Sequence, residues 1–394
     1  SLTLNDTPYG VGAFMYRDSP GSGTFAATGA RLKWNYGLNG FDTLPEDIEV
    51  SLYATEMVYI PEGPFAFGDG NGTTASDYSW RVKGTSDYVY VGDYLAPLMV
   101  NPHWDADDQA RLIGIRVHGK EGMDWDGDGV IDNPRFPTGY KAFYIMKYET
   151  TQGQYADFLN TLNPNQISNA YLFPNTIQNR FTITLQEGKY VCSRPDRACN
   201  YLEDKRPASL ADWMALRPMS AMEYEKAARG PLNPVVNEYA WGTASSVIMT
   251  GISSEENGTE FPLPENSNIR GSASLSGGDG GQGPVRAGIF ARENTDRITS
   301  GESYWGVMEL SGNMGECMQE LTYDGTYRGY QDNHGDGEIP YHGYANSLKY
   351  LHKNGYLENL SQAYSLRYSR VSFYSVYYNE YSGARFVRNA PELP

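Results

Sequence analysis

ADWMALRPMSAMEYEKAARG, residues 211–230, is the stretch that decides how this chain folds. Its second half opens with Ser220 and carries Glu223 three positions later, which is the capping-box pattern of a helix start. Gly230 follows the last helix-forming residue and is typical of a helix end. The sequence therefore predicts a helix over 220–230.

Two further helices and a buried strand are predicted from the same kind of pattern. Residues 209–216 read as a short helix, and residues 150–162 carry one apolar face behind Thr150 or Thr151 as a cap. The run over 142–148 is apolar enough for a buried strand that packs on the second of these helices.

Charged side chains inside the block at 211–230 are expected to be buried in pairs. We expect Arg217 and the Glu223/Glu225 pair to form ion pairs near the centre of the domain. Their role is then structural, because charges are buried in proteins when they are paired.

Composition limits the classes of function. The chain has 394 residues, which indicates one large decorated domain or a large and a small one. Its net charge of -17, from 31 Lys and Arg against 48 Asp and Glu, opposes nucleic-acid binding. No apolar run approaches the roughly 18 residues of a membrane-spanning helix. The start, SLTLND, has no methionine or apolar leader, so we expect a processed product or a fragment.

The N-terminal part differs from the rest. Residues 1–55 alternate polar and apolar side chains between glycine-rich turns, which predicts strands. We expect the end of a β-sandwich or a docking piece there, with IEVSLYATEMVYI, 48–60, as one of its strands and 42–49 as a linker or loop. We expect residues 56–394 to form the main domain, with a calcium-loop insertion near 120–135.

Five blocks in order resemble the signatures of the formylglycine-generating enzyme (sulfatase-modifying factor) family. The resemblance implies that the main domain, 56–394, is formylglycine-generating-enzyme-like, with an α+β, C-type-lectin-like fold that is loop-rich with few helices and follows a small β-rich segment. The blocks are MVYIPEGPFAFGDG (57–70), KAFYIMKYETTQGQYADFLN (141–160), ADWMALRPMSAMEYEKAARG with YAWG (211–230, 239–242), YWGVMELSGNMGECMQE (304–320) and SGARFVR (382–388).

The chemistry of that family is not expected here. The resemblance implies a copper-binding cysteine pair just upstream of the last block, because copper prefers thiolate ligands. The corresponding segment, LRYSRVSFYSVYY (366–378), contains no cysteine. Cys317 stands where relatives carry tryptophan, and Cys192 and Cys199 are either a local disulfide or two buried thiols. We therefore expect a non-catalytic relative.

The resemblance also implies two calcium sites built from oxygen ligands. The first would use the Asn268 side chain, the Ile269 carbonyl, the Asp279 carboxylate and the Gly281 carbonyl. The second would use the side chains of Asn313 and Glu316, with the carbonyl groups at 314 and 315. The alternative is a flexible loop at the first place and a turn cap at the second.

A third calcium loop is predicted without reference to the family. MDWDGDGVIDNP carries alternating aspartates and then a glycine, as EF-hand-like and thrombospondin-type loops do. Arg135 occupies the twelfth position, where an EF-hand has its bidentate glutamate, so another ligand must complete the shell. The predicted ligands are Asp124, Asp126, Asp128 and Asp132.

Three functions remain open. The first is a secreted or cell-surface, calcium-stabilised binding or structural protein, with a protein or glycan partner on its Tyr/Ser/Asn-rich C-terminal surface. The second is an enzyme with altered oxygen-dependent chemistry, although the five histidines form no metal triad in the sequence. The third is a self-assembling subunit of an extracellular filament or secretion-associated complex; the family resemblance implies export, as in a secreted bacterial protein. The predicted ligand-binding residues are Arg367, Tyr368, Tyr374, Tyr377 and Tyr378.

Overall fold

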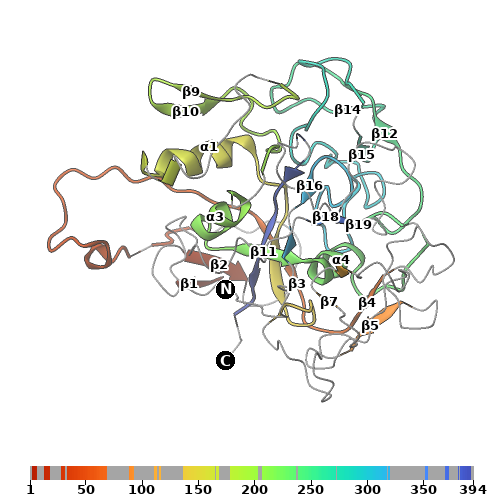
Figure 1. Cartoon of the computed structure of the whole chain (residues 1–394), viewed down its shortest axis with the longest axis horizontal. Helices are drawn as coiled ribbons and strands as arrows, with labels where there is room; N and C mark the ends of the chain where they lie inside the picture. The colour runs from red at the N-terminus through yellow and green to blue at the C-terminus, as the bar shows by residue number, and fades with distance from the viewer. Residues whose placement is uncertain are drawn as a thin grey trace.

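The chain folds into mixed α and β structure with few helices and small sheets (Figure 1). In the part of the chain that is described, no helix has the length and apolar character to cross a membrane. The computed structural model describes residues 2–6, 13–17, 28–31, 33–68, 88–92, 111–112, 115–116, 136–164, 166–167, 178–202, 206–236, 238–271, 273–316, 318–319, 351–353, 369–371, 380 and 382–391.

A five-stranded sheet takes one strand from each of the five sequence blocks. The strand order is β17-β11-β21-β8-β3. Neighbours pair antiparallel except β11 and β17, which run parallel. Strands far apart in sequence, such as β8 and β21, therefore lie side by side. The strands are β3 (Met57–Ile60), β8 (Phe143–Met146), β11 (Arg217–Ser220), β17 (Met318–Gln319) and β21 (Phe386–Asn389).

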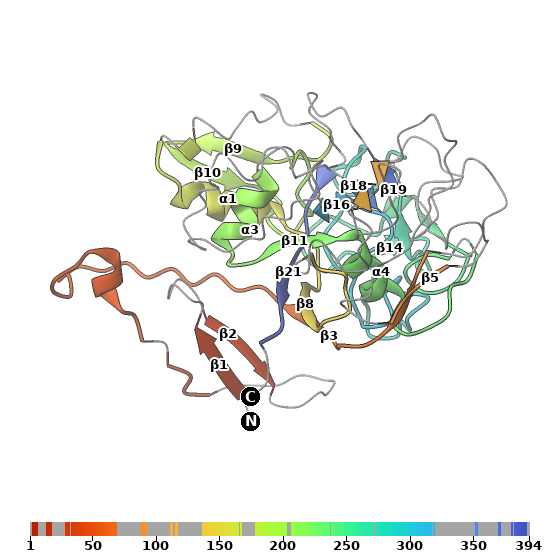
Figure 2. The ribbon, with the colours of Figure 1, turned by 60° about the horizontal axis from the view of Figure 1, so that its bottom comes forward.

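The middle of this sheet is fully buried. Ile145 on β8 pairs with Val58 on one side and with Val387 on the other. Ile145, Val387 and Phe386 are all completely inaccessible. The C-terminal strand is thus a central strand of the core, and Figure 2 shows β21 beside β8.

Helix α4 (Ala221–Arg229) follows β11 without a loop and confirms the predicted helix start and end. The Ser220 hydroxyl accepts from the Glu223 backbone N–H, and the Glu223 carboxylate accepts from the Ser220 N–H. Gly230 caps the other end with a positive φ of 66°. Its Cα lies against the Tyr304 ring, where a Cβ would clash.

Helices α1 (Gln152–Thr161) and α3 (Arg206–Trp213) lie close to their predicted positions. Thr151 is the N-cap of α1, and Gln154 completes a capping box. The apolar face of α1 packs into a core cluster with α3, and the Phe158 and Trp213 rings stand 5.7 Å apart.

The remaining strands form small sheets around this core, and a 3-10 helix, η1 (Tyr36–Asn39), lies in the N-terminal part. The two-stranded sheets are β1 (Leu2–Asp6) with β2 (Ala13–Arg17), β4 (Phe65–Phe67) with β5 (Val89–Val91), β6 (Arg111–Leu112) with β7 (Ile115–Arg116), β9 (Ile183–Gln186) with β10 (Lys189–Cys192), β12 (Ile248–Met249) with β15 (Ile269–Arg270), and β13 (Gly251–Ile252) with β14 (Pro262–Leu263). A four-stranded sheet has the order β19 (Ser369–Val371), β18 (Leu351–Lys353), β16 (Gly315–Glu316), β20 (Ser382–Gly383).

The predicted strand over 48–60 is only partly a strand. Residues 57–60 pair with β8, whereas 48–56 run without any strand assignment. Alternation of polar and apolar residues gives an extended segment one apolar face. A β-strand also needs a neighbouring strand for its backbone hydrogen bonds. Figures 1 and 2 show this segment, with η1, projecting from the body of the molecule.

Candidate functional site: buried carboxylates beneath a pocket

Arg385, from the last sequence block, lies at the centre of the molecule. Its side chain is completely buried and every nitrogen donates a hydrogen bond. Nε donates to Glu316, while the two terminal nitrogens donate to the carbonyl oxygens of Met146, Lys147 and Met308. This one side chain therefore links β16 and the end of β8 to the C-terminal segment.

Three buried glutamates surround that single guanidinium. Glu149 accepts from the Met314 N–H at 2.9 Å and from the Asn313 amide. Glu309 accepts from the Gly288 N–H at 2.9 Å. Glu316 pairs with Arg385 through one oxygen. The cluster thus places three carboxyl groups against one buried cation.

This imbalance changes the protonation of the glutamates. Burial and then the nearby Glu309 charge raise the pKa of Glu149 well above its usual range. Burial raises the pKa of Glu309 to about 7, although Arg385 opposes the shift. Burial also raises the pKa of Glu316. The cluster therefore favours taking up positive charge, as protons or as a cation.

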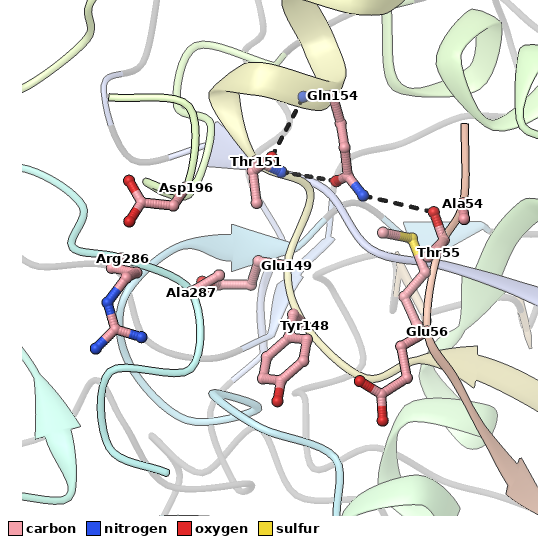
Figure 3. A pocket seen from close by; sticks show the side chains of 11 residues that line it. Ala54, Thr55, Glu56, Tyr148, Glu149, Thr151, Gln154, Asp196, Arg286 and Ala287 are labelled. Carbon is pink, nitrogen blue, oxygen red and sulfur yellow. Dashed lines mark hydrogen bonds between the residues drawn. The ribbon is translucent and has the colours of Figure 1, made fainter. Parts of the chain in front are cut away.

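A surface pocket of about 450 Å³ opens above Glu149 (Figure 3). Gln154, at the start of α1, donates to Thr55 and so joins the helix to the segment before β3 on one side of the pocket. The pocket is lined by Ala54, Thr55, Glu56, Met146, Tyr148, Glu149, Thr151, Gln154, Asp196, Arg286 and Ala287.

Most charges at the pocket already have partners. Glu56 pairs with Lys147 at 2.8 Å, and Arg286 pairs with Glu260 at 2.7 Å. In the described part of the chain, Asp196 has no ion-pair partner. The pocket is thus mildly acidic and has no arrangement of nucleophile and base that would identify a reaction.

The structure brings the residues of the second predicted calcium site into this cluster. Asn313 bonds Glu149 through its amide nitrogen and accepts from the Val285 N–H at 3.0 Å. The second oxygen of Glu316 is buried and has no hydrogen-bond partner in the described part of the chain. An orphaned carboxylate oxygen in an acidic cluster fits a hard cation. Within the described ranges, however, no three acidic, His or Cys side chains are grouped to hold one, so backbone carbonyls would have to contribute.

The residues of the first predicted calcium site have other partners in the structure. Asn268 accepts from the Val247 N–H at 2.9 Å and donates to the Ile298 carbonyl at 2.8 Å. The Gly281 carbonyl accepts from Leu275. Ile269 lies buried on β15. Calcium at this place would have to compete for oxygens that are already bonded.

Asp279, the carboxylate of that first site, lies at the exposed side of an ion-pair network whose two arginines are buried. It accepts from Arg180 at 2.5 Å and from Arg197 at 2.7 Å, and Glu256 accepts from both arginines. Burial opposes the shift, yet hydrogen bonds with Glu256 and Arg197 and the charges of both arginines lower the pKa of Asp279 to about 2. A cation here would compete with both guanidinium groups for the Asp279 carboxylate.

The other predicted site residues lie outside the described part of the chain. These are the loop aspartates Asp124, Asp126, Asp128 and Asp132, and the C-terminal residues Arg367, Tyr368, Tyr374, Tyr377 and Tyr378.

The charged residues that organise the core were not singled out from the sequence. Glu149 and Arg385 both lie directly beside buried strands, in YETT and GARF. A charged residue between apolar positions of a predicted strand end is the signal that could have indicated them. The expected pairing of Arg217 with Glu223 is confirmed at 2.6 Å, whereas Glu225 pairs with Arg229 instead.

The two described cysteines are free thiols. Burial, followed by the charges of Asp157 and Asp196, raises the pKa of Cys192 to about 11. Burial raises the pKa of Cys199 well above its usual range. Both side chains are therefore protonated at neutral pH, and neither has the thiolate character that nucleophiles and soft-metal ligands need.

The sequence matches no known family model and no curated protein. The functional assignment therefore depends on the residues and their geometry.

Proposed function

We propose that this chain is a secreted or cell-surface binding or structural protein, stabilised by calcium, on a formylglycine-generating-enzyme-like scaffold that lacks the catalytic cysteines. One observation carries the proposal: the central sheet takes one strand from each of the five blocks that resemble this family. A common sheet is what a shared scaffold requires, because blocks that resemble a family only by chance would have no reason to pair.

The contacts of Arg385 support the same scaffold. The guanidinium of SGARFVR bonds Glu316 of the GNMGEC block and the carbonyl groups at the end of β8. Three of the five blocks are thus joined at one buried side chain.

A non-catalytic role is supported by the sequence before the last block. No cysteine occurs over 366–378, so the soft ligands of a copper site are missing there. Cys192 and Cys199 do not replace them, because their raised pKa values keep both thiols protonated. Binding of a protein or glycan is instead assigned to the Tyr-rich segment around Tyr374 and Tyr378.

Calcium is proposed first at the Asn313–Glu316 turn, where the buried cluster has more carboxylates than cations. A bound Ca²⁺ would neutralise Glu149 and Glu316 and hold the turn against β8. It would act as a structural ion, because the described residues around it are buried.

The test is metal content together with thermal stability of the purified full chain. We expect calcium in the protein and a melting temperature that falls by several degrees in EDTA and returns with excess CaCl₂. Glu316→Gln should lose this response. Lys147→Met, which removes the ion pair with the exposed Glu56 and a contact with the Tyr148 ring but touches no residue of the Asn313–Glu316 turn, should keep it.

Two outcomes would reject the proposal. If the melting temperature is the same with EDTA and with CaCl₂, calcium does not stabilise the protein. If the protein binds copper or iron stoichiometrically and turns over a thiol substrate, it is an enzyme and the non-catalytic role is rejected.

A further inference from the structure

The segment over 42–56, here named the acidic arm, has a strand-like sequence but no strand partner. Ile48, Val50 and Leu52 alternate with Glu49 and Ser51, which places three apolar side chains on one side of an extended chain. Val50 is 81% and Leu52 is 79% exposed. Such alternation is expected where one face of a strand is covered, yet nothing in the described part of the chain covers this one.

The backbone N–H and C=O groups of most of the arm also lack hydrogen-bond partners in the described part of the chain. Within the described ranges, residues 42–54 make no hydrogen bond. Eight residues, 46–53, suffice for an ordinary strand of about 26 Å at 3.3 Å per residue. A free strand backbone with an apolar face is the structure that adds to an open sheet edge of another protein.

One end of the arm is held by the body of the structure, while the other end contacts the neighbouring segment around η1. At its start, the Phe41 ring packs edge-on against Trp34 at 6.0 Å. At its end, the Tyr53 ring lies 5.0 Å from Trp213 of α3, and Lys147 donates its N–H to the Glu56 carbonyl. Fixing the C-terminal end lowers the entropy that binding would cost, while the middle stays available.

The charge of the arm defines its partner. Residues 42–56 contain five acidic side chains and no base, and no Lys or Arg occurs anywhere over 34–80. A second copy is disfavoured because the whole chain carries a net charge of -17. We propose that the acidic arm adds as a β-strand to the open sheet edge of a different protein, where basic side chains flank that edge.

This surface is separate from the C-terminal tyrosines and from the carboxylate cluster. A negative result in the calcium or glycan tests therefore does not affect the proposal for the acidic arm. A negative result for the acidic arm does not affect the proposed function.

The first experiment uses the purified full chain alone. Amide hydrogen exchange should be close to the intrinsic rate over 46–53 and slow in β8 and β21. Sedimentation should show no self-association that depends on Val50. Slow exchange over 46–53, or a dimer lost in Val50→Asp, would overturn the proposal, since the arm would then be paired within the chain or with a second copy.

The second experiment identifies what the arm contacts. A photo-crosslinking amino acid at position 50 of the full chain, in the cells that make it, should attach to one protein at an edge strand next to Lys or Arg. Crosslinks to another copy of this chain, to lipid, or scattered over many proteins would contradict the proposal.

The purified crosslinked protein then gives a quantitative check. Val50→Asp should weaken its binding to the full chain at least about tenfold, and added salt should weaken wild-type binding. The matched control, Ser51→Ala on the opposite face of the arm, should bind like the wild type. Because Val50 is mostly exposed, its substitution leaves the core intact and unchanged binding would refute the assignment.

Discussion

At the residue scale, Arg385 is the side chain on which most of the buried polar structure depends. Arg385→Met would remove the partner of Glu316 and one hydrogen-bond donor from each of the carbonyl groups of Met146, Lys147 and Met308. Breaking one partner of a buried ion pair costs about 3–5 kcal/mol. We expect that loss in the free energy of unfolding, measured by urea denaturation.

The control for Arg385 is a more exposed ion pair, Lys147 with Glu56. Lys147→Met removes the bond to Glu56, whose side chain is 60% exposed. Exposed ion pairs contribute about 0–1 kcal/mol. Equal losses in the two variants would show that Arg385 is not the organising residue.

Glu309 should make stability depend on pH near neutrality. Its pKa is about 7 in the folded chain and has an ordinary value of 4.5. Between these values the folded chain keeps a proton that the unfolded chain has lost, so the contribution is full below about pH 4.5 and disappears as pH rises through about 7. The shift corresponds to ~3 kcal/mol.

Glu309→Gln should flatten this dependence. Urea denaturation at pH 5 and at pH 7.5 compares the two proteins, and the wild type should lose more stability over that interval. Identical changes in the variant and the wild type would assign the pH dependence to other groups.

At the element scale, the start of α4 depends on one hydroxyl. Ser220→Ala removes the acceptor for the Glu223 N–H and the donor to the Pro137 carbonyl. Loss of a helix N-cap costs about 0.5–2 kcal/mol. We expect a decrease of that size in the free energy of unfolding, with Ser220→Thr retaining most of the stability. Equal stability of both variants would contradict the role of the cap.

The ends of elements were the best-predicted features of this chain. Thr151, Ser220 and Gly230 act at helix ends through contacts with residues three or four positions away. Such contacts are local, so the sequence pattern is enough to place them. The segment 48–56 was predicted as a strand and is not one, because pairing depends on a neighbour that alternation cannot specify.

At the scale of the whole molecule, the last strand completes the core. A chain ending at residue 381 would lack β21 and leave β8 and β11 without their common neighbour. We expect it to show no cooperative thermal transition by circular dichroism. A chain ending at residue 391 keeps β21 and should melt like the full chain. Cooperative melting of the shorter chain would show that the core forms without its central strand.

The candidate site was only partly predictable. Asn313 and Glu316 were expected together and do lie in one cluster, because they belong to one short turn. Asn268 and Asp279 were expected to share an ion, but Asp279 instead bonds arginines 80 to 100 residues away. Partners at that separation are chosen by the packing of the chain.

The sequence by itself determined the helix ends, the acidic charge, the five ordered blocks and the absence of cysteine over 366–378. These properties are local or additive, so they need no knowledge of distant neighbours. Only the tertiary structure decided that each block contributes a strand to one sheet and that Glu149, Glu309 and Glu316 surround Arg385. The physical reason is burial: charges far apart in the sequence must meet once they leave water, and the fold alone determines which of them do.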